Sequence, residues 1–162
     1  MNADWRDFFI TSAGAAAALA GLIFVSLSVN IAHILKWSHL PDRAVATLGA
    51  LMLILTVSLA DLMPQGGTAL GVEVLFFTGF VWWLQLRSGL TAIRSGEANG
   101  RPPWESRFEL AAGQAQALPF LVGAVLLLIG GPGARFWLAG GTLTVFVFSA
   151  VNAWVLLVEI LR

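Results

Sequence analysis

Few residues in this sequence could do chemistry, and none form a familiar catalytic pattern. His33 and His39 lie six positions apart, a spacing that does not place both rings on one helix face. Asp61 and Glu73 are separated by a segment without Lys or Arg, and Arg135 is the obvious neutralising partner for them. There is no Gly-rich phosphate loop, nucleophile elbow or HExxH motif. We therefore predict no catalytic site, no metal site, no cofactor and no enzymatic activity.

Asp61 and Glu73 allow two interpretations. In the first, one carboxylate pairs with Arg135 at the edge of the protein and the other is solvated. In the second, both form an acidic mouth that concentrates cations, as carboxylate rings do in cation channels. One copy of the chain has too few carboxylates for a ring, so the second interpretation requires a symmetric oligomer.

Amides and hydroxyls form a second group of candidate residues. The stretches FVSLSVN (24–30) and FVFSAVN (146–152) share four of seven residues, including Asn30 and Asn152. We expect the two asparagines to lie at similar depth and to face the protein interior as polar anchors. Ser149 shares a helical stripe with Asn152, and Gln116 lies on a comparable stripe of the preceding segment.

The composition indicates that these side chains sit in a membrane. Hydrophobic residues make up 58% of the chain and charged residues only 11%, and the mean hydropathy is +0.84. An ordinary soluble domain has about 25% charged residues. Nine basic residues balance nine acidic ones, so the chain has no net charge that would attract nucleic acid. It also lacks cysteine, which excludes disulfides and iron–sulfur clusters.

Five apolar segments are each long enough to cross a bilayer as a helix, which needs about 20 residues. We predict an all-α, single-domain integral membrane bundle over 1–162 with five transmembrane helices at 8–35, 43–63, 69–91, 108–130 and 136–161. Two Lys or Arg residues fall on the side of the N-terminus and seven on the other side. The positive-inside rule then places the N-terminus outside and the C-terminus in the cytoplasm.

The first segment carries a run of small residues, AGAAAALAG (13–21). Gly14 and Ala18, like Ala17 and Gly21, are four positions apart, so they lie on one helix face. Such spacing lets another helix backbone approach closely, which stabilises helix pairs in lipid. We predict a docking surface at Gly14, Ala17, Ala18 and Gly21, and its partner is this chain's own bundle, a second copy or a different protein.

The same region carries a family resemblance. The stretch DFFITSAGAAAALAGLIFVSLSVN (7–30), followed by LPDRA (40–44), resembles small bacterial multi-span proteins often labelled as modulators of the membrane-anchored protease FtsH. The resemblance covers about the first third of the chain. It implies a non-catalytic, regulatory role in the bacterial inner membrane and no catalytic residues.

These observations lead to one functional hypothesis and two alternatives. We expect an accessory or regulatory subunit of a larger membrane assembly, whose partners are lipid and another integral membrane protein or copies of itself. The first alternative is a homo-oligomeric conduit for ions or small solutes, fronted by Asp61 and Glu73. The second is a subunit that holds a cofactor through His33.

Overall fold

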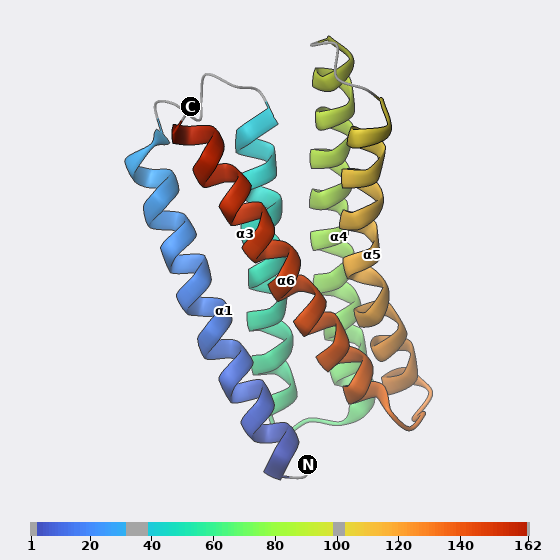
Figure 1. The fold of residues 1–162 in the computed structure, drawn as a ribbon. Helices are drawn as coiled ribbons and strands as arrows, with labels where there is room; N and C mark the ends of the chain where they lie inside the picture. Colours follow the sequence, from blue (N-terminus) through green and yellow to red (C-terminus); the bar gives the residue numbers. More distant parts are fainter. Residues whose placement is uncertain (1–2, 32–38, 99–102, 162) are drawn as a thin grey trace.

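The computed structural model describes residues 3–31, 39–98 and 103–161, and these residues form five helices (Figure 1). They are α1 (Ala3–Val29), α3 (His39–Leu62), α4 (Gly67–Ala98), α5 (Pro103–Leu128) and α6 (Ala134–Leu161). The predicted all-α class is confirmed, and each predicted segment falls on one helix. Most bounds differ from the prediction by one to seven residues, and only the end of the last helix at 161 agrees. The first helix starts at Ala3 and has Asp4 in its first turn, where a carboxylate favours a helix start, and α4 continues to Ala98, beyond residue 91.

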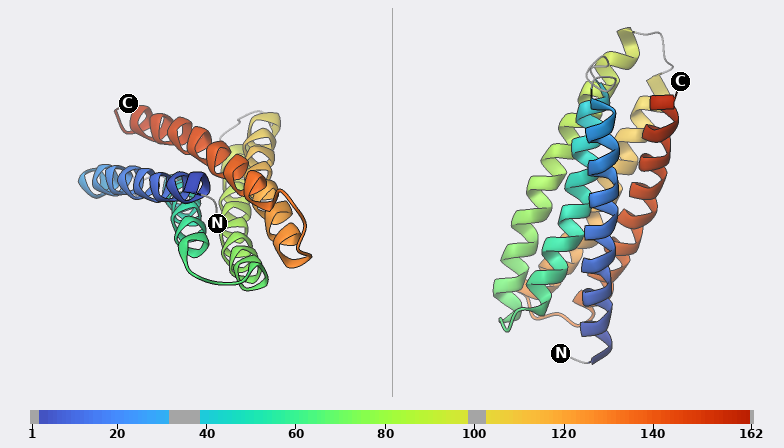
Figure 2. Two further views of the ribbon diagram at one scale, coloured as in Figure 1. Left: turned by 90° about the horizontal axis from the view of Figure 1, so that it is seen from below. Right: turned by 90° about the vertical axis from the view of Figure 1, so that its left-hand side faces the viewer.

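The helices run alternately up and down as an elongated bundle (Figures 1 and 2). The N-terminus, the α3–α4 connection and the α5–α6 connection lie together at one end, which we call the N-terminal end. Helix α3 is central because it packs against α1, α4 and α6. Helix α5 packs against α4 and α6, so α4 and α5 form a hairpin on one side of the bundle.

The α5–α6 connection reverses the chain within a few residues. Gly130 and Gly133 have φ values of 67° and 81°, a backbone region that glycine adopts without steric cost. The N–H of Gly130 donates to Leu127 O at 3.3 Å, and the N–H of Gly131 donates to Leu126 O at 2.7 Å. This is the Schellman pattern, which ends α5 and turns the chain into α6.

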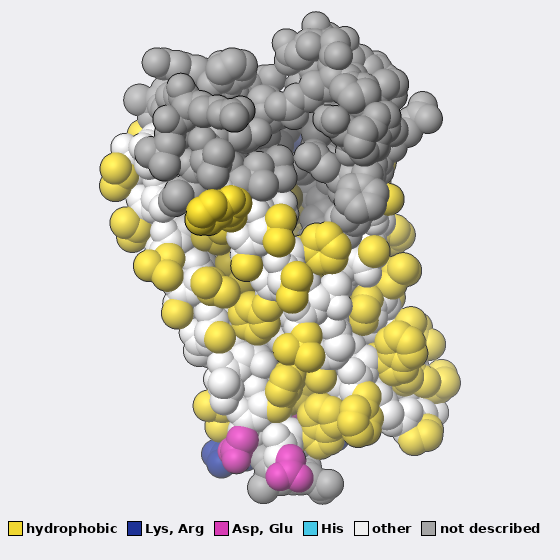
Figure 3. Space-filling model, viewed as in Figure 1, with side chains coloured by type: hydrophobic (Ala, Val, Ile, Leu, Met, Phe, Trp, Pro, Cys, Tyr) yellow, Lys and Arg dark blue, Asp and Glu magenta, His cyan; other side chains and the backbone are white. Residues whose placement is uncertain are grey.

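Side chains from all five helices form one contiguous hydrophobic core. Its fully buried members include Phe9 of α1, Ile54 of α3, Val74 of α4, Phe120 of α5 and Leu138 of α6. The outer surface is also apolar, and many large side chains are exposed on it, among them Leu22, Phe76, Phe136 and Trp154. In the view of Figure 3, hydrophobic side chains cover the middle of the bundle, and the charged side chains drawn gather at the N-terminal end. An apolar surface of this extent suits lipid rather than water.

Four helices are long and apolar enough to cross a membrane. Their spanning parts are Asp4–Val29, Ala44–Leu62, Gly67–Thr91 and Ala134–Trp154. Among the described residues, the apolar part of α5 is shorter and runs over Gly113–Leu128. The structure is thus a helical bundle with several candidate transmembrane helices. A fifth span, as predicted from the sequence, would have to be formed by α5.

Candidate functional site

An ion pair joins α3 to α6 at the N-terminal end of the bundle. The Nε–H of Arg135, in the first turn of α6, donates to Oδ1 of Asp61 at 3.0 Å and to Oδ2 at 3.3 Å. The side chain of Asp61 is 0% exposed, whereas that of Arg135 is 36% exposed. One of the two carboxylates was expected to pair with Arg135, and in the structure it is Asp61. The two members of the pair differ strongly in their access to solvent.

Glu73 has a different partner, which the sequence did not reveal. The Nε2 of Gln65, in the α3–α4 connection, donates to Glu73 Oε2 at 2.8 Å and to the backbone oxygen of Ala60 at 2.9 Å. Gln65 therefore links the end of α3 to the second turn of α4. Asp61 and Glu73 lie near the same end of the bundle, but one binds a guanidinium and the other an amide.

These groups border a pocket at the N-terminal end. The segment 61–67 forms most of its wall, together with Leu70 and Arg135, and the pocket has a volume of about 410 Å³. Asp61, Gln65 and Arg135 place a carboxylate, an amide and a guanidinium in this wall. We call this feature the end pocket. It can bind water or small polar molecules, because it offers both donors and acceptors.

The predicted docking surface on α1 faces away from the rest of the bundle. Gly14, Ala17, Ala18 and Gly21 are all exposed. A Cβ added to Gly14 or Gly21 would meet nothing within 4 Å, so the space beside both glycines is open. The small residues that α1 packs into its own bundle are instead Ala13, Ala16 and Ala20, which are buried.

The predicted polar anchors lie in different surroundings. Ser149 and Gln116 are buried inside the bundle, whereas Asn30 and Asn152 are partly buried. The Asn30 Nδ2 donates to Ser26 O of its own helix at 2.9 Å, so this bond does not join two helices.

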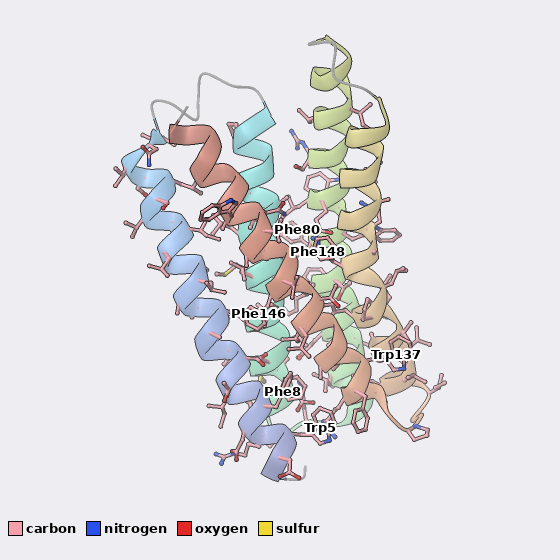
Figure 4. The ribbon with its side chains drawn as sticks, viewed as in Figure 1. Trp5, Phe8, Phe80, Trp137, Phe146 and Phe148 are labelled. Atoms are coloured by element: carbon pink, nitrogen blue, oxygen red, sulfur yellow. The ribbon has the colours of Figure 1, made fainter. Side chains whose placement is uncertain are left out.

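The two asparagines do not share one depth. The rings of Trp5 and Phe136 touch near the N-terminal end, with centroids 4.8 Å apart, and Figure 4 shows Trp5 there. Asn30 follows Trp5 by about 25 residues and Asn152 follows Phe136 by about 16, which at a rise of about 1.5 Å per residue leaves Asn30 roughly 13 Å farther along. The matching heptapeptides therefore do not mark matching positions.

Two buried hydroxyls of the bundle interior were not predicted from the sequence. Ser58 of α3 and Thr78 of α4 are both 0% exposed. Ser58 lies three residues before Asp61, one helical turn away on the same face, and that spacing was the available signal. Thr78 had no such signal, because apolar residues flank it on both sides.

A polar contact also joins α4 to α5. The indole Nε1–H of Trp82 donates to Gln114 Oε1. A hydrogen bond between transmembrane helices is worth about 0.6–2 kcal/mol, so this contact orients the hairpin more than it holds it together.

No metal or cofactor site emerges from the histidines. His33 lies outside the described residues, and the side chain of His39 is likewise not described. Among the side chains that the structure does describe, no three His, Asp or Glu residues gather in a group that could hold a metal ion. The absence of a cofactor remains a prediction.

No family model, curated protein or solved structure matches this chain.

Proposed function

We propose that this chain is a non-catalytic accessory or regulatory subunit of a larger assembly in the bacterial inner membrane, bound to its partner through α1. The observation that carries the proposal is the open, small-residue face at Gly14, Ala17, Ala18 and Gly21. A helix packed only in lipid has no need for a smooth face, since lipid chains adapt to any side chain. A second helix gains close backbone contact from such a face.

The short connections of the chain support a partner that binds within the membrane. Helix α3 ends at Leu62 and α4 begins at Gly67, and α5 ends at Leu128 and α6 begins at Ala134. Such connections offer little surface outside the bilayer for recognition. The resemblance of the first third to proteins labelled as FtsH modulators is in keeping with a regulatory role.

The alternative of a homo-oligomeric conduit has less support from the geometry. A pore between copies needs polar side chains on the outer surface, but Ser149 and Gln116 are buried in the interior of a single copy. Asp61, which would front the pore, is buried and paired with Arg135. Planar-bilayer recording separates the two functions, since an accessory subunit alone should show no ion conductance.

Lateral docking predicts that bulky substitutions on α1 abolish partner binding without unfolding the protein. We expect Gly14→Leu or Gly21→Leu to abolish co-purification of a second membrane protein in mild detergent. Stability should change by less than about 0.5 kcal/mol, because the added side chains enter open space. The matched control is Gly140→Leu on α6, which is also exposed and has nothing within 4 Å of an added Cβ.

Three outcomes of that experiment would contradict the proposal. Retention of the partner by both α1 variants would exclude docking through this face. Loss of the partner with Gly140→Leu alone would move the contact to α6. If the unmodified protein captures only copies of itself, the accessory role is wrong.

We also propose that all five helices cross the membrane, with the N-terminal end outside. Because the chain has no cysteine, single cysteines can report sidedness. We expect Gly66→Cys and Pro132→Cys, in the two connections at the N-terminal end, to react with a membrane-impermeant maleimide on intact spheroplasts. A cysteine at Gly100, between α4 and α5, should react only after permeabilisation. If α5 does not cross, Pro132→Cys will behave like the cysteine at position 100.

A further inference from the structure

Three hydroxyls buried in the core lack a hydrogen-bond partner among the described residues: Ser58 Oγ, Thr78 Oγ1 and Ser149 Oγ. They come from three different helices and are 0%, 0% and 2% exposed. A buried hydroxyl without a partner costs about 1–3 kcal/mol. Three in one small core therefore carry a combined cost that a bound molecule would offset.

The usual partner of a hydroxyl in a membrane helix is the carbonyl one turn earlier, and this chain uses it elsewhere. Thr142 Oγ1 donates to Leu138 O at 2.9 Å, Thr144 Oγ1 to Gly140 O at 2.8 Å and Thr56 Oγ1 to Met52 O at 2.8 Å. Ser58, Thr78 and Ser149 make no such bond. Their oxygens therefore have no partner among the described residues.

The positions of these hydroxyls form a graded series whose first member, Ser58, lies one helical turn before Asp61 in the wall of the end pocket. Counted along each helix at about 1.5 Å per residue, Ser58 lies roughly 6 Å from the end of α3, and Thr78 roughly 16 Å from the start of α4. On α6, Thr142 and Ser149 lie roughly 12 and 22 Å from its start. Ser58, Thr78 and Ser149 thus follow one another in depth with gaps of about 10 Å and about 6 Å. Thr142 lies within the larger gap and divides it into two steps of about 6 Å or less. A water that bonds to both neighbours spans about 5.5 Å.

Arg135, Thr142 and Ser149 follow one another at seven-residue intervals, so they lie on one face of α6. That face also carries Leu138 and Val145, which belong to the core. Helices α4 and α6 both pack against α3, which carries Ser58 and Asp61. The hydroxyls and the ion pair in the wall of the end pocket therefore face one interior.

We propose that Ser58, Thr78 and Ser149 bind water molecules inside the bundle, and that these waters exchange with the medium through the end pocket at Asp61 and Arg135. Water is the small ligand that can both donate to and accept from a serine or threonine hydroxyl, and buried waters typically make about three such bonds. This hydration is a property of one copy of the chain. It does not depend on the accessory role or on α1.

The absence of native cysteine allows a direct test with single thiols. The test positions are Ser58→Cys, Thr78→Cys and Ser149→Cys, which are nearly isosteric. The controls are Val57→Cys on α3, Ala16→Cys on α1 and Ala124→Cys on α5, each at most 1% exposed and none on the faces of α4 and α6 that carry Thr78 and Ser149. Gly66→Cys, at the exposed α3–α4 connection, gives the rate for a solvated thiol.

The probe is Ag⁺, a bare cation small enough to follow water, present on both sides of proteoliposomes. It replaces the thiol proton to form a silver thiolate, and the proton leaves to the buffer. The unreacted fraction is measured by maleimide labelling after denaturation. We expect the three test thiols to react at least about ten-fold faster than the control thiols, because the thiolate needs hydration to form. Ser58→Cys should be the fastest of the three.

Equal rates at the test and control positions would overturn the proposal, since the core would then be uniformly dry. A faster reaction at Ser149→Cys than at Ser58→Cys would overturn entry through the end pocket. Gel filtration and circular dichroism of each variant establish that it is folded. Two folded test variants and two folded controls are enough for the comparison.

Discussion

Arg135→Gln is expected to lower the free energy of unfolding by about 2–4 kcal/mol, because it leaves the Asp61 carboxylate buried without a cation. Asp61→Asn should lower it by only about 1 kcal/mol, since the freed Arg135 is partly exposed and can extend its guanidinium to water. Removing the cation and removing the carboxylate of one ion pair should therefore lower the free energy of unfolding by unequal amounts. The measurement is unfolding in mixed micelles with increasing dodecyl sulfate, followed by far-ultraviolet circular dichroism.

The double variant Asp61→Asn/Arg135→Gln provides the internal control. It removes both charges, so it should be more stable than Arg135→Gln alone, and the cycle should give a favourable coupling between the two residues. Equal losses for the two single variants would show that the difference in burial does not govern the energetics. A double variant as unstable as the sum of the singles would show that the ion pair contributes nothing.

Gly71→Val is expected to destabilise the α4–α5 hairpin by about 1–3 kcal/mol through overpacking. A Cβ added at Gly71 would lie 3.1 Å from the backbone oxygen of Ala124 and 3.0 Å from Cγ of Leu128, both in α5. The backbone oxygen cannot move aside without displacing the helix. The same unfolding measurement should show the loss of stability, and the melting temperature of the variant should be lower.

Gly79→Val is the matched control for this prediction. Gly79 lies on the same helix, two turns further along, and a Cβ there would meet nothing within 4 Å. The change in helix propensity is the same at both sites, so it cancels in the comparison. Similar stability of the two variants would contradict the close approach of α4 and α5 at Gly71.

Five helices could be predicted from the sequence because a chain in lipid must form helices about as long as the bilayer is thick. The choice of faces could not be predicted in the same way. Two sets of small residues interleave on α1, one around Ala16 and one around Gly14 and Gly21, and only the first is buried. Hydropathy does not separate them, and the face that α3 presents decides which set is covered.

In the candidate site, the charged residues could be predicted from the sequence, whereas the buried hydroxyls could not. Asp61 and Arg135 stand out because charges are rare in such apolar helices, and a pairing of Arg135 with one of the two carboxylates was predicted. Ser58 had its spacing to Asp61 as a signal, whereas Thr78 is flanked by apolar residues on both sides. A helix with lipid on one side and a hydrophobic core on the other has no amphipathic period, so the sequence does not indicate which way a lone hydroxyl points.

The ion pair also bears on biogenesis. Asp61 and Arg135 are 74 positions apart, and Arg135 opens α6, the last of the five helices in chain order. During synthesis α3 therefore enters the bilayer well before the guanidinium that will neutralise its buried carboxylate. Until α6 follows, the carboxylate lacks this cation, so a ribosome-bound intermediate that ends before α6 carries an unneutralised carboxylate near the N-terminal end of the bundle.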